Sequence, residues 1–470
     1  MAGSKKMSEE RRRMILEDPL ARVLPIIAFP MIISQLVNSF YSIADTFFVS
    51  QLGTAATAAI GVNDSLTHFN QAVAQGFGAG ASSYVSRLLG ERKDKDASQV
   101  GSTVLLVCMA FMVLIACTCY LFMSPLVDLL GATATSKSYS MDYARFILLG
   151  APFTGGTFVL SQLLRSEGST GYAMMGTVSG CIVNVVLDPI FISVLGLGVV
   201  GAAVATTISK IISFAILLIP FLKKHTLVDL HLSNCKFRWS MMYEVVRMGM
   251  PTFLKSTCMS VASTVTNNVA REFGDYALAS VSVANKTMKF LESIIIGFSN
   301  GIQPVVGQCW GAKKYKRVKD VFWFVVGIGG AMSIVMGGLF TLLAPNIIQM
   351  FVSSTATDEL LATGTLALQT QCIVLFAHMM VMIASGVFQA LGKAVNATVL
   401  AMSRSILFLI PMTIILPALF DVEGLACARA AADVAAFACA ALPLLIRFVK
   451  DLNRKIEQSE KSGSADLVKT

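Results

Sequence analysis

Four polar side chains recur along one face of the first long apolar stretch of the chain. They are Gln35, Asn38, Ser42 and Asp45, spaced three, four and three residues apart. This spacing places them on one side of an α-helix whose other sides are apolar. Such a stripe faces either a water-filled cavity that receives a ligand or a polar contact with another helix. We favour the cavity, because Asp45 has no cationic residue within one helical turn.

A second set of polar side chains lies in the fifth apolar stretch. Asn184 and Asp188 are four residues apart, and Pro189 follows directly. Proline has no amide hydrogen and bends the helix, which leaves a backbone carbonyl near Val185 without its donor. A carboxylate, an amide and a free carbonyl oxygen together suit a proton or a small cation such as sodium. The alternative is an ordinary proline kink beside a hydrogen-bonded aspartate.

Taken as membrane-spanning helices that alternate in direction, the apolar stretches hold these and two further polar residues at one depth. Asp45 and Asp188 lie in the outer halves of helices that run outward, and Asp64 and Thr206 lie in the outer halves of helices that run inward. A common depth permits a shared site but does not by itself establish contact.

The chain is too apolar to be a soluble protein. Hydrophobic residues make up 55% of its 470 residues and charged residues only 14%, whereas soluble domains have roughly 25% charged residues. Residues 97–127 and 321–357 contain no charge, and each run is long enough for a membrane-spanning helix. The net charge of +9 does not indicate nucleic-acid binding, since Lys and Arg fall in short polar gaps rather than on one basic face.

The hydrophobic pattern predicts an all-α membrane protein with about twelve transmembrane helices. Lys and Arg gather in alternate loops, and the positive-inside rule places those loops and both termini in the cytoplasm. The expected spans lie near residues 24–49, 55–75, 99–124, 140–163, 172–195, 199–222, 248–272, 276–306, 321–345, 359–390, 395–417 and 424–447.

The chain contains an internal repeat with an offset of 221 residues. Residues 76–81 (GFGAGA) correspond to residues 297–302 (GFSNGI), and Gly90 corresponds to Gly311. Because six spans precede the linker, both halves enter the membrane in the same direction and should be related by a pseudo-twofold axis along the membrane normal. The expected organisation is a cytoplasmic tail at 1–22, a six-helix lobe at 23–222, a cytoplasmic linker at 223–247, a second six-helix lobe at 248–449 and a cytoplasmic tail at 450–470.

The C-terminal lobe carries a different set of charges. Lys289 and Glu292 are three residues apart and are expected to pair, either to stabilise the lobe or as part of a central cavity. Arg429 and Asp433 are four residues apart, which favours a structural pair. His378 is isolated in its span and favours a packing or cavity role over metal binding.

Several motifs together make the chain similar to a known family. Residues 44–49 (ADTFFV), residues 184–189 (NVVLDP) and the glycine-rich span ends at 76–90 and 297–311 resemble those of the MATE (multidrug and toxic compound extrusion) family. The resemblance covers about residues 15–450, and the acidic residues of the N-terminal lobe make the DinF-like and MepA-like branches the nearest. It implies two six-helix lobes and an exporter that releases its substrate as protons or sodium ions enter.

The resemblance also implies roles for individual residues. In similar proteins the carboxylates of the first and fifth spans bind the coupling cation, and these match Asp45 and Asp188. Asn38, Asn184 and Thr206 match positions that line the cavity of the N-terminal lobe. The predicted cation-coupling residues are Asp45, Asp188 and Asn184, with sodium at Asp45 and Asp188 as the alternative to a proton; the predicted substrate-cavity residues are Gln35, Asn38, Tyr41, Ser42, Asp64, Thr206, Lys289 and Glu292.

The expected function is secondary active efflux of amphipathic, often cationic organic compounds in exchange for protons or sodium, by alternating access. Such an antiporter is expected to work as a monomer in the lipid bilayer of a bacterial-type inner or plasma membrane, without cofactors or nucleic acid. The alternative is a related flippase or exporter of lipid-linked or polymeric substrates, for which Lys255, Arg271, Lys286 and Lys289 would provide a basic cavity. A membrane enzyme is not expected, since the sequence has no HExxH, GxSxG or Walker motif.

Overall fold

The computed structural model describes residues 2–50, 54–130, 136–351 and 358–467. Within these ranges, it does not describe the side chains of residues 2–8, 43, 45–47, 49–50, 54–58, 275, 351, 358 and 462–467. The described residues are helical almost throughout and contain no strand. The predicted all-α membrane fold is therefore confirmed.

In the first half of the chain, the described residues form eight α-helices and one π-helical turn. Pro189 ends α7 because its ring nitrogen has no hydrogen to donate, and the chain continues in the turn η1. The elements are α1 (Ala2–Glu17), α2 (Leu20–Ser50), α3 (Thr54–Gly90), α4 (Asp94–Leu121), α5 (Met123–Leu129), α6 (Lys137–Ser166), α7 (Thr170–Pro189), η1 (Ile190–Val194) and α8 (Gly198–Leu222).

The second half follows a linker that holds a single 3₁₀ turn. Within α15, Phe420 and Asp421 have non-helical backbone angles, so the chain turns there between two helical runs. The elements are η2 (Leu232–Asn234), α9 (Trp239–Glu272), α10 (Asp275–Gly311), α11 (Tyr315–Phe351), α12 (Asp358–Ile373), α13 (Leu375–Ala390), α14 (Ala394–Met402), η3 (Ser403–Leu409), α15 (Ile410–Ala436), η4 (Phe437–Ala441) and α16 (Leu442–Leu467).

Many of these helices are suited to a membrane. Seven described helical stretches, or eight if the bent pair α12 and α13 is counted as one span, are long and apolar enough to cross a bilayer. Helices α3, α9 and α10 are also long, but they are more polar and are not among those seven or eight. Because lipid excludes polar side chains, the polar faces of these three helices are expected to turn toward the protein interior or toward water.

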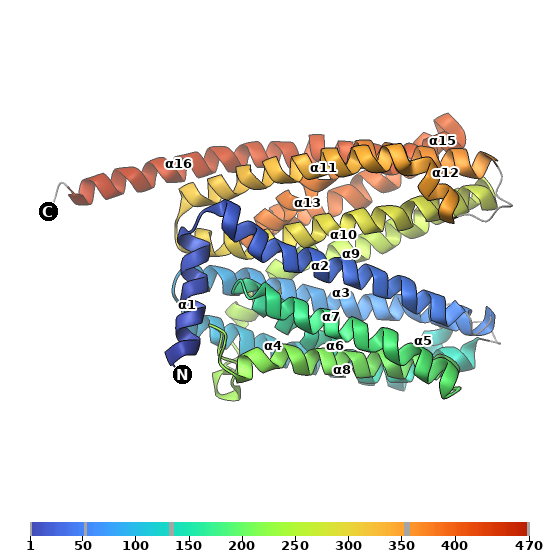
Figure 1. Cartoon of the computed structure of the whole chain (residues 1–470), viewed down its shortest axis with the longest axis horizontal. Helices are drawn as coiled ribbons and strands as arrows, with labels where there is room; N and C mark the ends of the chain where they lie inside the picture. The colour runs from blue at the N-terminus through green and yellow to red at the C-terminus, as the bar shows by residue number, and fades with distance from the viewer. Residues whose placement is uncertain (1, 51–53, 131–135, 352–357, 468–470) are drawn as a thin grey trace.

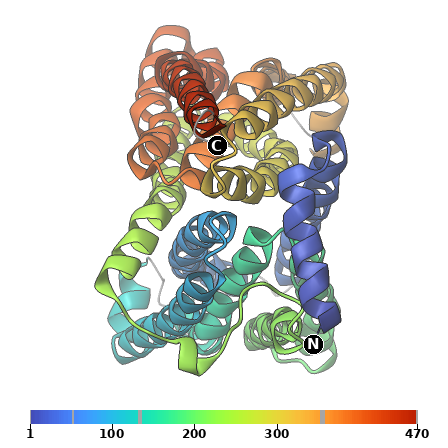
Figure 2. The same ribbon diagram turned by 90° about the vertical axis from the view of Figure 1, so that its left-hand side faces the viewer.

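The helices run along one long axis in two groups (Figures 1 and 2). We call α2–α8 the N-lobe and α9–α16 the C-lobe. Helix α2 packs against α7 of its own lobe and against α10 of the C-lobe, and α3 packs against both α9 and α10. The three polar helices therefore lie at or beside the interface between the lobes.

One end of the molecule carries both termini, and we call it the basic end. It includes the turns at residues 91–93 and 312–314 and the linker at 223–238. Figure 1 shows α1 lying across the helices at this end, while α16 extends beyond them. Within the predicted tail at 1–22, residues 2–17 thus form the docked helix α1, and α2 begins at Leu20.

Helix α1 contacts both lobes. On the N-lobe side, the buried Arg12 forms an ion pair with Asp94 at the start of α4. On the C-lobe side, Arg317 of α11 donates to the backbone carbonyl oxygens of Ile15 at 2.9 Å and Asp18 at 2.6 Å. The last carbonyls of a helix have no partner within it, so Arg317 satisfies the end of α1 while tying it to the C-lobe.

The lobes also meet at the basic end through glycines of the repeat. A Cβ atom on Gly90 would lie 2.2 Å from the carbonyl oxygen of Gln308, and one on Gly311 would lie 2.1 Å from that of Arg87. Further along the same helices, a Cβ on Gly80 would lie 2.0 Å from a carbonyl oxygen of α9, and one on Gly301 would lie 2.6 Å from the backbone of α2. The backbones of facing helices touch here, which closes the basic end.

Candidate functional site

A buried polar cluster lies inside the N-lobe, where α7 packs against α8. Asp188 is 0% exposed and Asn184 is 2% exposed. In the amide orientation that satisfies both ends of Asn184, its Nδ2 donates to Asp188 Oδ2 at 3.1 Å and its Oδ1 accepts from the backbone N–H of Thr206 at 3.1 Å. The structure thus brings together three of the predicted residues, Asn184, Asp188 and Thr206.

Pro189 and η1 follow this cluster directly. The proline leaves the carbonyl of Val185 without a helical donor, and the next turn has π-helical rather than α-helical hydrogen bonds. Such turns often mark functional positions in helices. The cluster therefore lies where the α-helical hydrogen-bond pattern of α7 is already interrupted, so the helix can bend there without losing further α-helical hydrogen bonds.

The predicted partner of Asp188 lies on α2. The backbone of Asp45 belongs to α2, but its side chain lies outside the described residues, so the predicted pair stays a prediction. Of the other residues on this stripe, Asn38 and Ser42 are exposed, whereas Gln35 and Tyr41 are half-buried. Helix α2 packs against α7, which keeps the stripe and the buried cluster on neighbouring helices.

Equivalent exposed stripes on α3 and α10 indicate an open space between the lobes, which we call the cleft. On α10, Ser282, Lys286 and Lys289 are exposed, whereas Ser293, next on the same face, is buried and lies 2.6 Å from Ser39 of α2 between hydroxyl oxygens. Since Ser39 belongs to the N-lobe, this face of α10 turns toward the N-lobe. Its exposed upper part therefore borders an open space between the lobes.

The repeat gives α3 the same pattern. Gly61, Ser65 and His68 are exposed and Ala72 is buried, and these positions lie 221 residues before the four on α10. The predicted cavity residue Asp64 is also exposed, and it experiences the charges of both His68 and Lys289. Since Asp64 belongs to the N-lobe and Lys289 to the C-lobe, and both are exposed, we infer that they face the same open space.

Two pairs of aromatic rings join the lobes beside the exposed stripes, and we call this level the floor of the cleft. Phe69 of α3 meets Phe253 of α9 edge-to-face with ring centroids 6.5 Å apart, and Phe290 of α10 meets Phe40 of α2 at 6.0 Å. Phe69 and Phe290 are equivalent residues of the repeat. Phe40 is 61% exposed and Phe69 48% exposed, so apolar ring surface is available to a ligand at the floor. Beyond it, toward the basic end, the glycine contacts close the interface.

The C-lobe holds a buried ion network that differs from the expected pairs. Glu292 accepts from Arg404 at 3.0 Å and from Arg429 at 2.6 Å, so the expected Lys289–Glu292 pair is wrong. Asp433 accepts from Arg404 at 2.6 Å rather than from Arg429. Lys289 and Glu292 share a helix, but Lys289 faces the cleft while Glu292, 8% exposed, points into the lobe.

His378 completes this network. Its Nδ1 lies 3.3 Å from Asp433 and its Nε2 lies 3.6 Å from Glu292, which places it in the packing role that the sequence favoured. The two arginines balance the two carboxylates, and all five side chains are buried or nearly so. We interpret Glu292 as part of this structural network rather than as a cavity residue.

Two charged or titratable residues described above were not predicted from the sequence: Arg404 of the buried network and His68 of α3. Arg404 is the single charged residue between residues 394 and 420, and a lone intramembrane arginine requires a carboxylate partner. His68 lies one turn from Asp64, at the position equivalent to Lys289. Both signals were present in the sequence, but the partners could be assigned only once the helices were placed in space.

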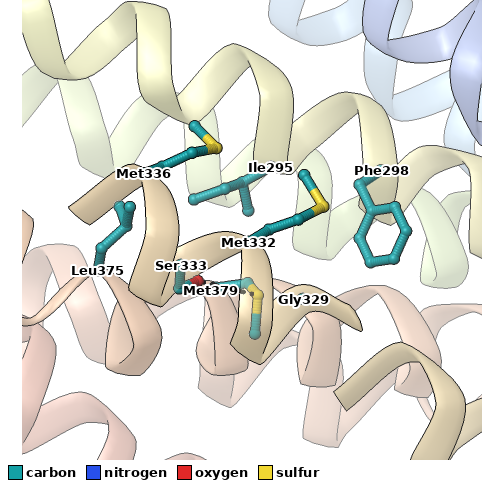
Figure 3. Close-up of a pocket in the computed structure, with 8 residues that line it drawn as sticks. All are labelled: Ile295, Phe298, Gly329, Met332, Ser333, Met336, Leu375 and Met379. Carbon is teal, nitrogen blue, oxygen red and sulfur yellow. Dashed lines mark hydrogen bonds between the residues drawn. The ribbon is translucent and has the colours of Figure 1, made fainter. Parts of the chain in front are cut away.

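The C-lobe also contains a small enclosed pocket, which is unsuited to an organic substrate. Figure 3 shows side chains of α10, α11 and α13 around it, and Ser333 donates to Met379 Sδ at 3.3 Å. The free space is no larger than about one water molecule. Its lining is Ile295, Phe298, Gly329, Met332, Ser333, Met336, Leu375 and Met379.

Known proteins share this architecture. The multidrug export protein MepA of Staphylococcus haemolyticus (strain JCSC1435) is 28% identical over 420 residues, which cover 89% of this chain and 92% of that protein. A crystal structure of MATE in complex with MaL6 is 26% identical and has a TM-score of 0.89, covering 94% of this chain and 99% of that one. An outward-facing conformation of a multidrug resistance MATE family transporter of the MOP superfamily is also 26% identical with a TM-score of 0.89, covering 94% and 98%.

A family model describes the two lobes separately. The model, described as MatE, matches residues 30–190 and 251–415, together more than half of the chain. The two matched segments begin 221 residues apart, which is the offset of the repeat. The chain therefore belongs to the MatE family, the MATE transporters of the membrane.

Proposed function

We propose that this protein is a secondary active multidrug efflux antiporter, which exports amphipathic organic compounds in exchange for protons, with sodium ions as the alternative. The similar MepA proteins are named as multidrug export proteins, which supports export as the direction of transport. The observation that carries the proposal is that two like lobes touch through backbone contacts at the basic end and, further along the same facing helices, carry exposed polar stripes from which we infer the cleft. Transport, rather than catalysis, is the work of such a site.

The orientation follows from charge. Loops at the basic end carry many Lys and Arg residues, which places that end in the cytoplasm, together with both termini. The cleft then opens outward, as in the similar transporter described as outward-facing. The inward-open state would be reached by parting the lobes at the basic end and closing them at the other. The residues concerned, in these loops and in the first turns of the helices that follow, are Arg92, Lys93, Lys95, Lys313, Lys314 and Lys316.

The coupling step would take place in the N-lobe. Protonation of Asp188 removes a buried charge that Asn184 now satisfies with a hydrogen bond, and it changes the balance of contacts between α7, α8 and α2. Pro189 and η1 give α7 a place to bend in response. Binding of the cation and of the substrate would then favour different arrangements of α2 and α7, which is the differential affinity that exchange requires.

The test is transport by the purified protein in proteoliposomes, as a monomer, under separately imposed proton and sodium gradients. We expect a proton gradient directed as in cells to drive accumulation of a fluorescent organic cation, and dissipation of that gradient to stop it. Accumulation under the sodium gradient alone would assign sodium as the coupling ion. Transport that ignores both gradients would refute antiport.

A further inference from the structure

The two walls of the cleft have the same shape but different charge. On α3 the exposed stripe is Gly61, Ser65 and His68, whereas the equivalent stripe on α10 is Ser282, Lys286 and Lys289. The repeat therefore replaces a nearly neutral stripe of the N-lobe with a cationic one in the C-lobe.

The C-lobe wall extends onto α9. Beyond Phe253, which touches Phe69 of the N-lobe, α9 carries a polar stripe whose five residues are all exposed: Thr257, Ser260, Thr264, Asn267 and Arg271. Their spacing of three or four residues keeps them on one helix face. Arg271 thus adds a third positive charge near the outer end of the same wall.

The two lysines lie far along α10 from its outer end, although their side chains are exposed. Lys289 is fourteen residues from the first residue of α10, about 21 Å along the helix at 1.5 Å per residue. A charge at that depth of a membrane is costly unless water or a partner of opposite charge stabilises it. Neither lysine has a carboxylate within ion-pair distance among the described residues; Glu292 pairs with Arg404 and Arg429 instead, and Asp64 of the opposite wall experiences the charge of Lys289.

Two other cations of the C-lobe interior show the contrast. Arg404 and Arg429 are held by Glu292 and Asp433 in the buried network. Lys286 and Lys289 lie outside that network, on the exposed face. A positive wall in a water-filled cleft attracts negatively charged ligands and repels positively charged ones.

We propose that Lys286 and Lys289 bind an anionic group of the transported compound, a carboxylate or a phosphate, while Phe40 and Phe69 contact its apolar part. This inference rests on the proposed export function and names its substrate class: amphiphiles with an anionic group, including zwitterions. A zwitterion would place its cationic group toward Asp64 and its anionic group toward the lysines, and thus contact both lobes across the cleft.

The test compares two dyes that differ in a single charge, a zwitterionic rhodamine with a free carboxylate and its cationic methyl ester. Equilibrium binding to the full-length protein in nanodiscs is measured without a gradient. We expect the Lys286→Gln/Lys289→Gln variant to bind the free acid at least about tenfold more weakly, while its affinity for the ester stays within about twofold or improves. Lys316→Gln, at an exposed lysine outside the cleft, is the matched control and should change neither affinity. The Lys286→Gln/Lys289→Arg variant keeps one positive charge in the cleft, so it should bind the free acid more tightly than the Lys286→Gln/Lys289→Gln variant.

Equal losses for the two dyes, or no loss for either, would overturn the inference, and efflux of the ester by that same variant would leave the export function standing. Failure of the wild type to export either dye would instead count against the export function. Two competitors identify the source of the anionic group. Displacement of the free acid by short-chain phosphatidic acid, but not by the matching diacylglycerol, points to a lipid phosphate, and lack of displacement points to water-soluble anions.

Discussion

Gly90 of α3 and Gly311 of α10 occupy equivalent positions in the two repeats, and each is packed against the backbone beside the other. Gly90 faces the carbonyl oxygen of Gln308, and Gly311 faces that of Arg87. Arg87 and Gln308 are themselves equivalent residues, 221 positions apart. The pseudo-twofold axis thus exchanges the two halves of this contact. We call the contact around Gly90 and Gly311 the seam, and it closes the basic end.

The first prediction concerns this seam. Gly90→Ala and Gly311→Ala place a methyl group about 2 Å from a backbone oxygen, and such overpacking costs about 1–3 kcal/mol. Each variant should therefore disfavour the state that is closed at the basic end. Cysteine labelling of Ser86→Cys, buried in this seam, should become faster in both variants.

The control is Gly327→Ala on α11, where an added Cβ would meet nothing within 4 Å. It should leave the labelling rate unchanged. Equal labelling of all three variants would contradict the role of the seam in closing this end.

The second prediction concerns the docking of α1. Arg317→Ala removes the donor to the carbonyls of Ile15 and Asp18, and hydrogen bonds from a charged group contribute about 1.5–3 kcal/mol each. Hydrogen exchange of the α1 amides should accelerate roughly tenfold or more in this variant. Lys316→Ala, on the same helix but exposed, should leave it unchanged, and unaltered exchange in Arg317→Ala would show that α1 is held without this contact.

The third prediction concerns pH. Burial raises the pKa of Glu167 from 4.5 to about 7, although the backbone N–H groups of Leu227 and Val228 at 2.7 and 3.2 Å lower it in part. Because the folded-state pKa lies above the unfolded one, stability falls as the pH rises from about 4.5 to 7, by roughly 3 kcal/mol at most.

Thermal unfolding in detergent should show this loss between pH 5 and pH 8. Glu167→Gln lacks the titrating group, so its midpoint should depend less on pH than that of the wild type. Parallel pH profiles of the two proteins would rule out Glu167 as the cause.

The fourth prediction concerns the buried ion network. Arg404→Met leaves Glu292 and Asp433 without one of their cations, and loss of one partner from a buried pair costs about 3–5 kcal/mol. The variant should unfold at a clearly lower temperature or fail to accumulate. Lys289→Met is the matched change, and because Lys289 is exposed and outside the network, its stability should stay close to that of the wild type.

Local spacing and the repeat predicted much of this molecule. The cluster of Asn184, Asp188 and Thr206 followed from a spacing of four residues and from the family resemblance, and the structure places these groups in contact. The repeat identified Gly90 and Gly311 as equivalent residues, whereas their packing against the backbone of the opposite lobe became known only from the structure. The cluster and the equivalence depend on neighbours along the chain or on the repeat itself.

Contacts between distant helices could not be predicted in this way. Glu292 lies three residues from Lys289, yet its partners come from η3 and α15, more than 100 residues away. Arg12 of α1 pairs with Asp94, and Arg317 donates to the carbonyl of Ile15 in α1. Hydropathy alone predicts only a polar tail for this segment. A charge pattern identifies which residues need partners, whereas the packing of the helices decides which partners they find.

The central claim is that a buried carboxylate of the N-lobe couples ion entry to export. The most direct measurement is proton-gradient-driven accumulation, in proteoliposomes, of an amphipathic dye that the wild type transports, with equal amounts of wild type, Asp188→Asn and Asp45→Asn. Asparagine keeps the size and a hydrogen-bonding oxygen but takes up no proton, so both variants should bind substrate, remain folded and lose accumulation against a gradient. Accumulation by either folded variant at the wild-type rate would contradict the assignment of that carboxylate, and wild-type rates in both would contradict the account.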